Sequence, residues 1–190
     1  MPDPYLNITR LTVRQLSLDL CKCLPVYYIG IYRPRTHSLS EEEDSVQMIN
    51  LKNGVAAAAI YFAAKLNSAL ASEPQKNVIA MPAHSVGCAS PSRGLRQVLR
   101  LVSGVRDLSD CLYRHTEVPK SAFLPPWRRP TAEAHRASMR VSNPRLLNNL
   151  DLLLLDDVVT LGSSMCGASL VLADAGARSV TCLSLLSTQN

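Results

Sequence analysis

The C-terminal 40 residues constrain the fold more than any other part of the chain. The stretch DLLLLDD, residues 151–157, is a continuous apolar run of strand length, which is typical of a strand buried on both faces. Residues 163–177 have a helical pattern that ends near Gly176, and residues 179–187 form a second strand pattern. A strand, a helix and a strand with short links form a βαβ unit, whose strands are parallel. The sequence therefore predicts an α/β fold with an open, mainly parallel sheet flanked by helices.

Length and composition fit one globular domain spanning residues 1–190. Apolar residues make up 47% of the 190 residues and charged residues 18%. The longest apolar stretch, residues 55–64, is about half as long as a membrane-spanning helix. The N-terminus MPDPYLNITR lacks the basic-then-apolar order of a signal peptide. We expect a soluble, cytoplasmic protein with no membrane segment.

The remaining elements follow from periodicity. Strands are predicted at 24–32, 77–81 and 138–141, and helices at 54–71 and 95–102. The first of these helices is apolar almost all round, which indicates that it packs against the core on most sides. The acidic residues 41–44 are typical of a helix start that Ser40 caps. Residues 103–137 are rich in proline and basic residues, and we expect a long, mobile segment there.

The cysteines and the net charge bear on two questions, whether the chain holds a structural zinc ion and what kind of ligand it binds. Six cysteines are scattered along the chain, and the closest pair, Cys21 and Cys23, lacks the spacing of a structural zinc site. We expect buried free thiols. The formal net charge of +5 is compatible with a phosphorylated ligand and with nucleic acid, and it selects neither.

Two adjacent carboxylates, Asp156 and Asp157, follow the four leucines of the predicted strand. Ligands of open parallel sheets bind beyond the carboxyl ends of the strands, so the acidic pair is predicted at the edge of a site. Because successive side chains of a strand point to opposite faces, we expect the strand to end there. Two charges after an apolar run need a cation, hydroxyl donors or solvent beside them.

The loop that follows the acidic pair suits a phosphate group. Glycine and small residues permit a tight turn with exposed N–H groups, and the N-terminus of the next helix adds partial positive charge. The residues of this loop are Thr160, Leu161, Gly162, Ser163 and Ser164. Together with the acidic pair they predict a site for a phosphorylated sugar.

This segment resembles the signature of type I phosphoribosyltransferases, in which a strand ends in two acidic residues, two apolar residues and a Thr/Ser/Gly loop. The resemblance is strongest over residues 152–187. It implies that Asp156 and Asp157 bind the ribose hydroxyls of phosphoribosyl pyrophosphate and that residues 160–164 bind its 5-phosphate. It also implies Mg²⁺ as cofactor, held by the acidic pair directly or through ligand or water.

Within that family, the segments NVIAMP, PSRGLRQVLRLV and LYRHTEVPKSA look most like the ComF-like competence branch. The resemblance implies that Ala83, His84 and Ser85 face pyrophosphate, with Arg93 and Gly94 as an Arg-Gly motif. The N-terminal zinc module of that branch, with its C-x-x-C pairs, is missing here. Residues 51–190 would form the α/β core and residues 1–50 a small hood or N-terminal extension.

Basic residues between 103 and 137 are candidates for a lid over the pyrophosphate. These are Arg114, Lys120, Arg128 and Arg129. The same residues are also compatible with a solvated surface or a weakly supported nucleic-acid patch, since they lack regular aromatic interleaving. For the histidines at 84 and 135 a surface or structural role is favoured over catalysis, and for Trp127 the anchoring of a loop over stacking on a base.

Two classes of function stay open. The first is a pentosyltransferase that transfers the phosphoribosyl group to a nitrogen nucleophile and releases pyrophosphate. The second is a non-catalytic protein that binds phosphoribosyl pyrophosphate, a nucleotide or DNA as a competence-type partner. Leu161, in place of a hydroxyl residue, favours the second class, while the intact acidic pair favours the first. Thr160 stands where purine-salvage members carry a carboxylate, so a purine acceptor is not supported. Family members are often dimers, so a homodimer is compatible with the resemblance, and the oligomeric state stays open.

Overall fold

A computed structural model of the chain describes residues 12–16, 24–33, 43–71, 76–84, 86, 93–119 and 124–188. Its strands are β1 (Thr12–Leu16), β2 (Leu24–Tyr28), β3 (Ile31–Tyr32), β4 (Lys76–Ala80), β5 (Val105–Asp107), β6 (Leu112–Arg114), β7 (Met139–Val141), β8 (Asp151–Val159) and β9 (Ser179–Thr188). Its α-helices are α1 (Glu43–Lys52), α2 (Ala56–Ala69), α3 (Arg93–Leu101), α4 (Ala132–Ser138) and α5 (Ser163–Asp174). Short 3₁₀ helices lie at Ser109–Cys111, Pro126–Arg128 and Pro144–Leu146.

A seven-stranded sheet organises the molecule. Its order is β1-β2-β9-β8-β4-β5, and β3 pairs with β9 beyond the end of β2. All neighbouring strands are parallel except β1 and β2, which form an antiparallel pair at one edge. The predicted α/β class with an open, mainly parallel sheet is therefore confirmed.

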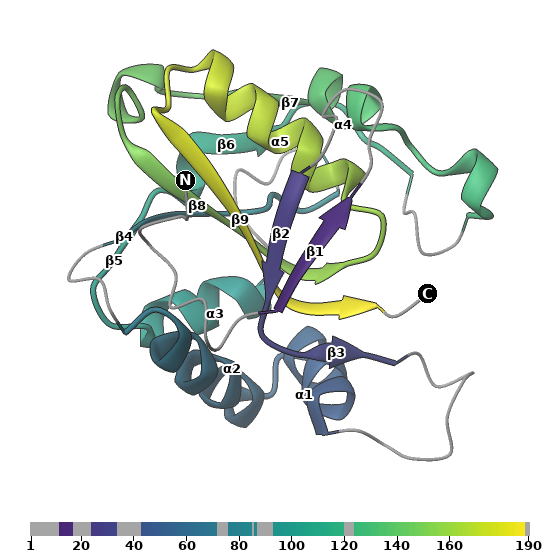
Figure 1. Cartoon of the computed structure of the whole chain (residues 1–190), viewed down its shortest axis with the longest axis vertical. Coiled ribbons are helices and arrows are strands. Elements are labelled where there is room, and N and C mark those ends of the chain that lie inside the picture. Colours follow the sequence, from purple (N-terminus) through teal and green to yellow (C-terminus); the bar gives the residue numbers. More distant parts are fainter. Residues whose placement is uncertain are drawn as a thin grey trace.

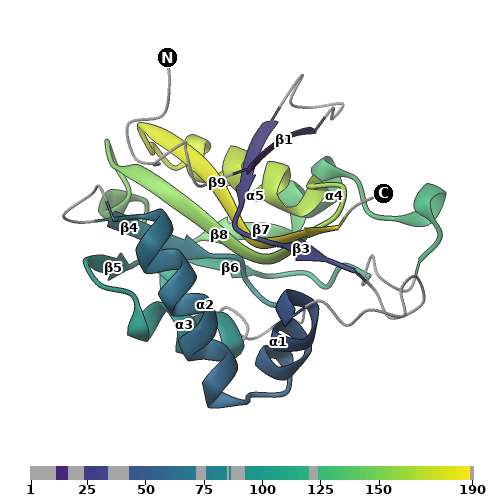
Figure 2. The ribbon, with the colours of Figure 1, turned by 60° about the horizontal axis from the view of Figure 1, so that its bottom comes forward.

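Helices cover both faces of the sheet (Figures 1 and 2). On one face, α1, α2 and α3 bury Met48, Phe62 and Leu95 in a core that includes Leu153 and Leu155 of β8. On the other face, α5 packs with the antiparallel pair of β6 and β7 in a second core, which includes Leu152 and Leu154. Alternate leucines of β8 thus serve opposite cores, because successive side chains of a strand point to opposite faces. This explains why the run is continuously apolar.

The strands and helices predicted after residue 50 are present, with ends shifted by a few residues. The expectation that the helix of residues 54–71 packs on most sides is wrong. The observed α2 leaves one face open, and Ile60 on that face is 60% exposed. Its opposite face is buried through Phe62 and Leu66. The error arose because alanine is apolar and yet contributes little to burial wherever it lies.

The long, mobile segment expected at residues 103–137 is also contradicted where the structure describes it. Residues 105–119 contain β5, a 3₁₀ turn and β6, and residues 124–138 contain a second 3₁₀ turn and α4. The two-stranded antiparallel sheet of β6 and β7 buries Leu112 and Met139 against α5. The prediction of a mobile segment rested on the many proline and basic residues, and the few apolar residues that are buried gave too weak a pattern to outweigh them.

The described parts of residues 1–50 extend the core. Residues 24–32, predicted as one strand, form β2 and β3, with a bend at residues 29 and 30. Helix α1 begins at Glu43, with Glu43 and Asp44 in its first turn, as the acidic pattern predicted. Ser40, with the two acidic residues before α1, lies outside the described residues. The hood assigned to residues 1–50 stays a prediction.

Two simpler expectations concern thiols and membranes. Cys111, Cys166 and Cys182 are buried free thiols, as predicted, while Cys21, Cys23 and Cys88 lie outside the described residues. None of the helices in the described ranges combines the length and the apolar character needed to cross a membrane.

Helices α4 and α5 are in contact at Gly167. A Cβ atom at this position would lie 2.6 Å from the carbonyl oxygen of Ala132 and 2.7 Å from the backbone nitrogen of Arg136. Both are backbone atoms, so no rotation of a side chain could relieve the contact. Glycine therefore allows α4 to lie directly on α5, the helix that follows the acidic pair.

We predict that Gly167→Ala destabilises the protein by about 2 kcal/mol, because the overlap outweighs the roughly 1 kcal/mol that alanine gains in helix propensity. Chemical denaturation measures the change. Ala173→Ser, which adds one atom at an exposed position of the same helix, is the control and should stay within about 0.5 kcal/mol of wild type. A Gly167→Ala variant as stable as wild type would show that α4 does not rest on α5.

Candidate functional site

The sheet has a switch point between β4 and β8. From β4 the chain passes through α3 to β5 on one side, whereas from β8 it passes through α5 to β9 on the other side. The helices α3 and α5 lie on opposite faces (Figure 1). The last hydrogen bond between the two strands runs from the Met81 N–H to the Leu155 carbonyl, at 2.7 Å. Beyond it the strands separate, which is the geometry of ligand crevices in open α/β sheets.

Asp156 and Asp157 lie immediately beyond this last pairing. The predicted end of the strand is only half correct, because β8 continues to Val159 through its ladder with β9. On the β4 side the pairing does end, at Leu155. The acidic pair therefore belongs to a strand that has a partner on one side and an open edge on the other.

The two carboxylates make different contacts. Oδ1 of Asp156 accepts the Asp157 N–H at 2.8 Å, and Oδ1 of Asp157 accepts the Val158 N–H at 2.7 Å. Oδ2 of Asp157 lies 3.3 Å from Nζ of Lys52, at the end of α1. Oδ2 of Asp156 accepts no hydrogen bond from the part of the chain that the structure describes. Each acid thus uses one oxygen on the backbone, and Asp156 retains an acceptor.

The surroundings of the acidic pair disfavour the charged form of Asp156. Burial and the negative charge of Asp157 raise the pKa of Asp156 to about 7, although the Asp157 N–H and the charges of Lys52 and Arg114 oppose the shift. A carboxyl group with a raised pKa lowers the free energy of unfolding at neutral pH. Carboxyl groups of this kind are common at functional sites.

Arg114 is part of the site and is not a lid residue. It ends β6 and is only 4% exposed. Its Nε donates to the Ala83 carbonyl at 3.3 Å, and an Nη donates to Oγ of Ser138. Burial lowers the pKa of Arg114, and the negative charge of Asp156 opposes that effect. The described residues form no ion pair between Arg114 and Asp156, so two partly desolvated opposite charges face the same region without contact.

The N-terminus of α5 lies next to the acidic pair. Gly162 adopts a left-handed conformation with φ 78°, and no side chain caps the helix that begins at Ser163. The hydroxyls of Thr160, Ser163 and Ser164 make no hydrogen bond to other residues within the described ranges. Leu161 is 38% exposed. Free N–H groups, free hydroxyls and the helix dipole are the features that bind phosphate.

The residues expected to face pyrophosphate are only partly placed. The carbonyl of Ala83, after β4, is tied to Arg114 and so lies near the acidic pair. His84 is exposed, and Arg93 is exposed at the start of α3. Ser85 lies outside the described residues.

Of the predicted lid residues that the structure describes, neither Arg128 nor Arg129 contacts the acidic pair. Arg128 is exposed, and Nε of Arg129 donates to the Leu124 carbonyl within its own segment. Trp127 is 82% exposed, so the expectation that it anchors a loop is wrong. Lys120 lies outside the described residues.

His135 has the structural character that was favoured for it. It is 6% exposed between α4 and α5, and its Nδ1 has no hydrogen-bond partner in the parts of the chain that are described. Burial, together with the charge of Arg114, lowers its pKa to about 4, so the imidazole is neutral at pH 7. A neutral ring beside Arg114 adds no second positive charge to the site.

The acidic pair fits a magnesium ion that arrives with a ligand. The described residues contain no group of three or more His, Cys, Asp or Glu side chains able to hold a metal. Mg²⁺ is commonly bound by one or two carboxylates with ligand phosphates and water completing its shell. Asp156 and Asp157 can supply that share and no more.

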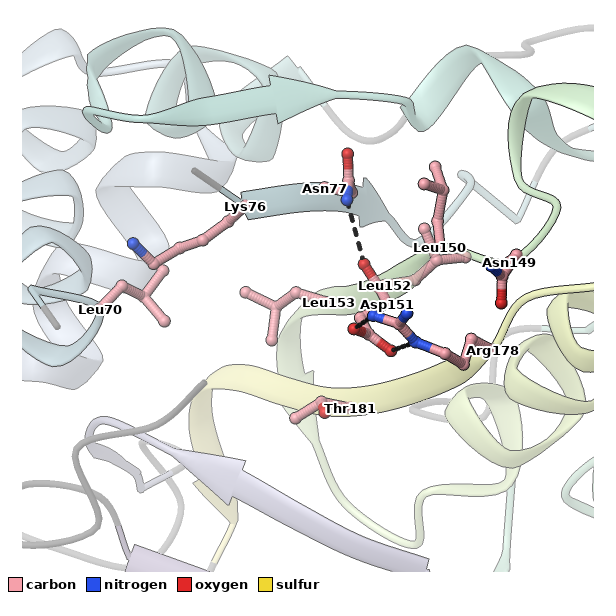
Figure 3. A pocket seen from close by; sticks show the side chains of 10 residues that line it. All are labelled: Leu70, Lys76, Asn77, Asn149, Leu150, Asp151, Leu152, Leu153, Arg178 and Thr181. Carbon is pink, nitrogen blue, oxygen red and sulfur yellow. Dashed lines mark hydrogen bonds and ion pairs between the residues drawn. The ribbon is translucent and has the colours of Figure 1, made fainter. Parts of the chain in front are cut away.

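A separate pocket of about 280 Å³ opens at the amino ends of the strands (Figure 3). Three of its polar residues bind one another: Arg178 forms a bidentate ion pair with Asp151, and Asn77 donates to the Asp151 carbonyl at 3.3 Å. Oγ of Ser179 also donates to Asp151, at 2.6 Å. The pocket lies at the amino ends of the strands, and the acidic pair lies at their carboxyl ends. Ligands of open α/β sheets do not normally bind at the amino ends.

Sequence reasoning missed one contact and misjudged another. Lys52 is distant from the acidic pair in the sequence, and no pattern around it signals the contact with Asp157. Arg114 had a signal, since the strand pattern LYR puts it on the same face as Leu112, which is fully buried.

Comparison with known proteins found no family model that matches the chain, and a search of curated proteins found no matching sequence.

We predict that Asp156→Asn stabilises the protein more at pH 8 than at pH 4.5. As the pH rises from about 4 to 7, the unfolded state ionises at position 156 while the folded state still holds its proton, so wild-type stability falls. Asparagine does not titrate, and the gain at pH 8 is up to about 4 kcal/mol. Thermal denaturation at both pH values measures it. Glu133→Gln, an exposed change, is the control, and an equal effect of Asp156→Asn at both pH values would contradict the prediction.

Proposed function

We propose that this protein binds phosphoribosyl pyrophosphate with Mg²⁺ and transfers its phosphoribosyl group to a nitrogen nucleophile. The observation that carries the proposal is the pairing of two features at one switch point. An acidic pair follows the last β4–β8 hydrogen bond, and an uncapped helix N-terminus follows the acidic pair. Carboxylates accept hydrogen bonds from sugar hydroxyls, and helix N-termini bind phosphate. A phosphorylated ribose carries both groups.

The ribose would lie across the open edge of β8. Asp156 has a free carboxylate oxygen, and Asp157 has one that contacts only the exposed ammonium of Lys52. Each can accept one of the two adjacent ribose hydroxyls. The 5-phosphate would then lie on the N–H groups and hydroxyls of Ser163 and Ser164.

Arg114 would face the diphosphate. It is buried, it holds the Ala83 carbonyl of the loop after β4, and its charge is not neutralised by an ion pair with a described residue. A buried guanidinium without a paired anion is costly unless a ligand supplies the negative charge. This supports an anionic ligand group between the β4 loop and the acidic pair.

The reaction would be a substitution at the anomeric carbon of the ribose. The bond from that carbon to the diphosphate oxygen breaks, and the diphosphate leaves with the electron pair. A carbon–nitrogen bond forms, and the nitrogen passes a proton to the leaving diphosphate or to water. Mg²⁺, when bound with the ligand, would neutralise charge on the leaving group. Arg114 would hold the leaving diphosphate, while the acidic pair and α5 would hold the phosphoribosyl group in place, so that positioning and electrostatics supply most of the catalysis.

We predict that the wild type binds phosphoribosyl pyrophosphate in the presence of Mg²⁺ and that Asp156→Asn/Asp157→Asn abolishes the binding, because the ribose hydroxyls lose their charged acceptors. Isothermal titration calorimetry measures both. A loss of affinity of at least about a hundredfold is expected, which corresponds to roughly 1.4 kcal/mol for each carboxylate.

The matched control is Asp110→Asn/Asp174→Asn, which removes two exposed carboxylates and changes the net charge equally. It should leave the affinity within about twofold. Equal losses in both double variants would mean that the effect is one of net charge, and the absence of binding at millimolar ligand would overturn the proposal. Binding without pyrophosphate release across a panel of amines and nitrogen bases would favour the non-catalytic class.

A further inference from the structure

We propose that Lys52 is a built-in counter-ion which keeps a divalent metal off the acidic pair until the phosphorylated ligand arrives. The inference rests on the proposed function only in taking Asp156 and Asp157 as ligand-facing groups. It assigns to a residue of α1, which no sequence pattern marks, the role of making metal binding depend on the ligand.

The contact between Lys52 and Asp157 has the features of an exchangeable ion pair. The atoms Nζ and Oδ2 are 3.3 Å apart, while the lysine side chain is 53% exposed and the aspartate side chain 25%. Among the described residues, Lys52 is the one cation within ion-pair distance of either carboxylate of the acidic pair. A half-exposed lysine pair of this kind contributes little to stability, so it can be broken at small cost.

The backbone that carries Lys52 is fixed, in contrast with its side chain. Leu51, the preceding residue, is 2% exposed in the core. A Cβ atom on Gly94 would lie 2.8 Å from Cγ of Leu51 and 3.0 Å from its carbonyl oxygen. Glycine at 94 thus lets the first turn of α3 lie against the last turn of α1. This close packing holds the end of α1 where the lysine side chain can contact Asp157.

An ammonium at this position competes with a metal ion for the same oxygen. Mg²⁺ gives up its water reluctantly and needs several oxygen ligands, so two carboxylates, one of them already paired with an ammonium, bind it poorly. A ligand that brings phosphate oxygens supplies the missing metal ligands and also attracts the released ammonium. Metal and phosphorylated ligand would therefore bind together, and metal alone would be excluded.

The test uses Mn²⁺ alone, followed by electron paramagnetic resonance of the free ion, with no organic ligand present. Lys52→Gln should bind Mn²⁺ at least about tenfold more tightly than wild type, because the competing charge is gone. Lys52→Arg should resemble wild type, since it keeps the charge. The substitution lies at a half-exposed position, and circular dichroism melting checks that the fold is unchanged.

Two controls locate the effect. Arg100→Gln removes an exposed charge from α3 and should leave Mn²⁺ affinity as in wild type. Lys52→Gln/Asp157→Asn should lose the gained affinity, which would place the metal at the acidic pair. An unchanged or weaker affinity of Lys52→Gln, or a gain that survives the loss of Asp157, would overturn the proposal. Failure of phosphoribosyl pyrophosphate to bind would instead overturn the proposed function, because the Mn²⁺ titration contains no sugar phosphate.

Discussion

The separation of β4 from β8 after the Met81–Leu155 hydrogen bond is the constraint on which the candidate site depends. Up to that point the two strands are neighbours in a parallel ladder, and beyond it their chains turn to opposite faces of the sheet. The open edge of β8 then carries the acidic pair, and the N-terminus of α5 follows a few residues later. An open strand edge of this kind arises from the topology of the sheet, so it needs no dedicated domain.

The charges around the acidic pair are arranged at a cost in stability. Asp156 is held with a raised pKa, Arg114 is buried without an ion-pair partner among the described residues, and Lys52 offers Asp157 only a half-exposed contact. Each arrangement is less favourable than a direct, buried ion pair with full hydrogen bonding or an apolar replacement. Proteins tolerate such costs at functional sites because the ligand offsets them. The pocket at the amino ends of the strands differs from the candidate site in this respect, because Asp151 and Arg178 neutralise each other there.

Most of the fold after residue 50 could be predicted from the sequence. The β8–α5–β9 unit is the clearest case, because continuous leucines, small residues and Gly176 mark its strand, its helix and the end of the helix. The acidic pair and the loop of residues 160–164 could be predicted for the same reason, because all their positions are local in the chain. Lys52 and the burial of Arg114 could not, since both depend on how distant elements pack. The exposure of Trp127 and of Ile60 shows the same limit, because residue type sets the gain from burial while tertiary packing decides whether it is realised.

The most direct test of the central claim is a crystal structure of the protein grown with phosphoribosyl pyrophosphate and Mn²⁺, with the metal located by its anomalous scattering. We predict the 5-phosphate at the N-terminus of α5, the ribose hydroxyls within hydrogen-bonding distance of Asp156 and Asp157, and the diphosphate facing Arg114. Ligand bound in the pocket beside Asp151 and Arg178, with none in the crevice between β4 and β8, would contradict the claim.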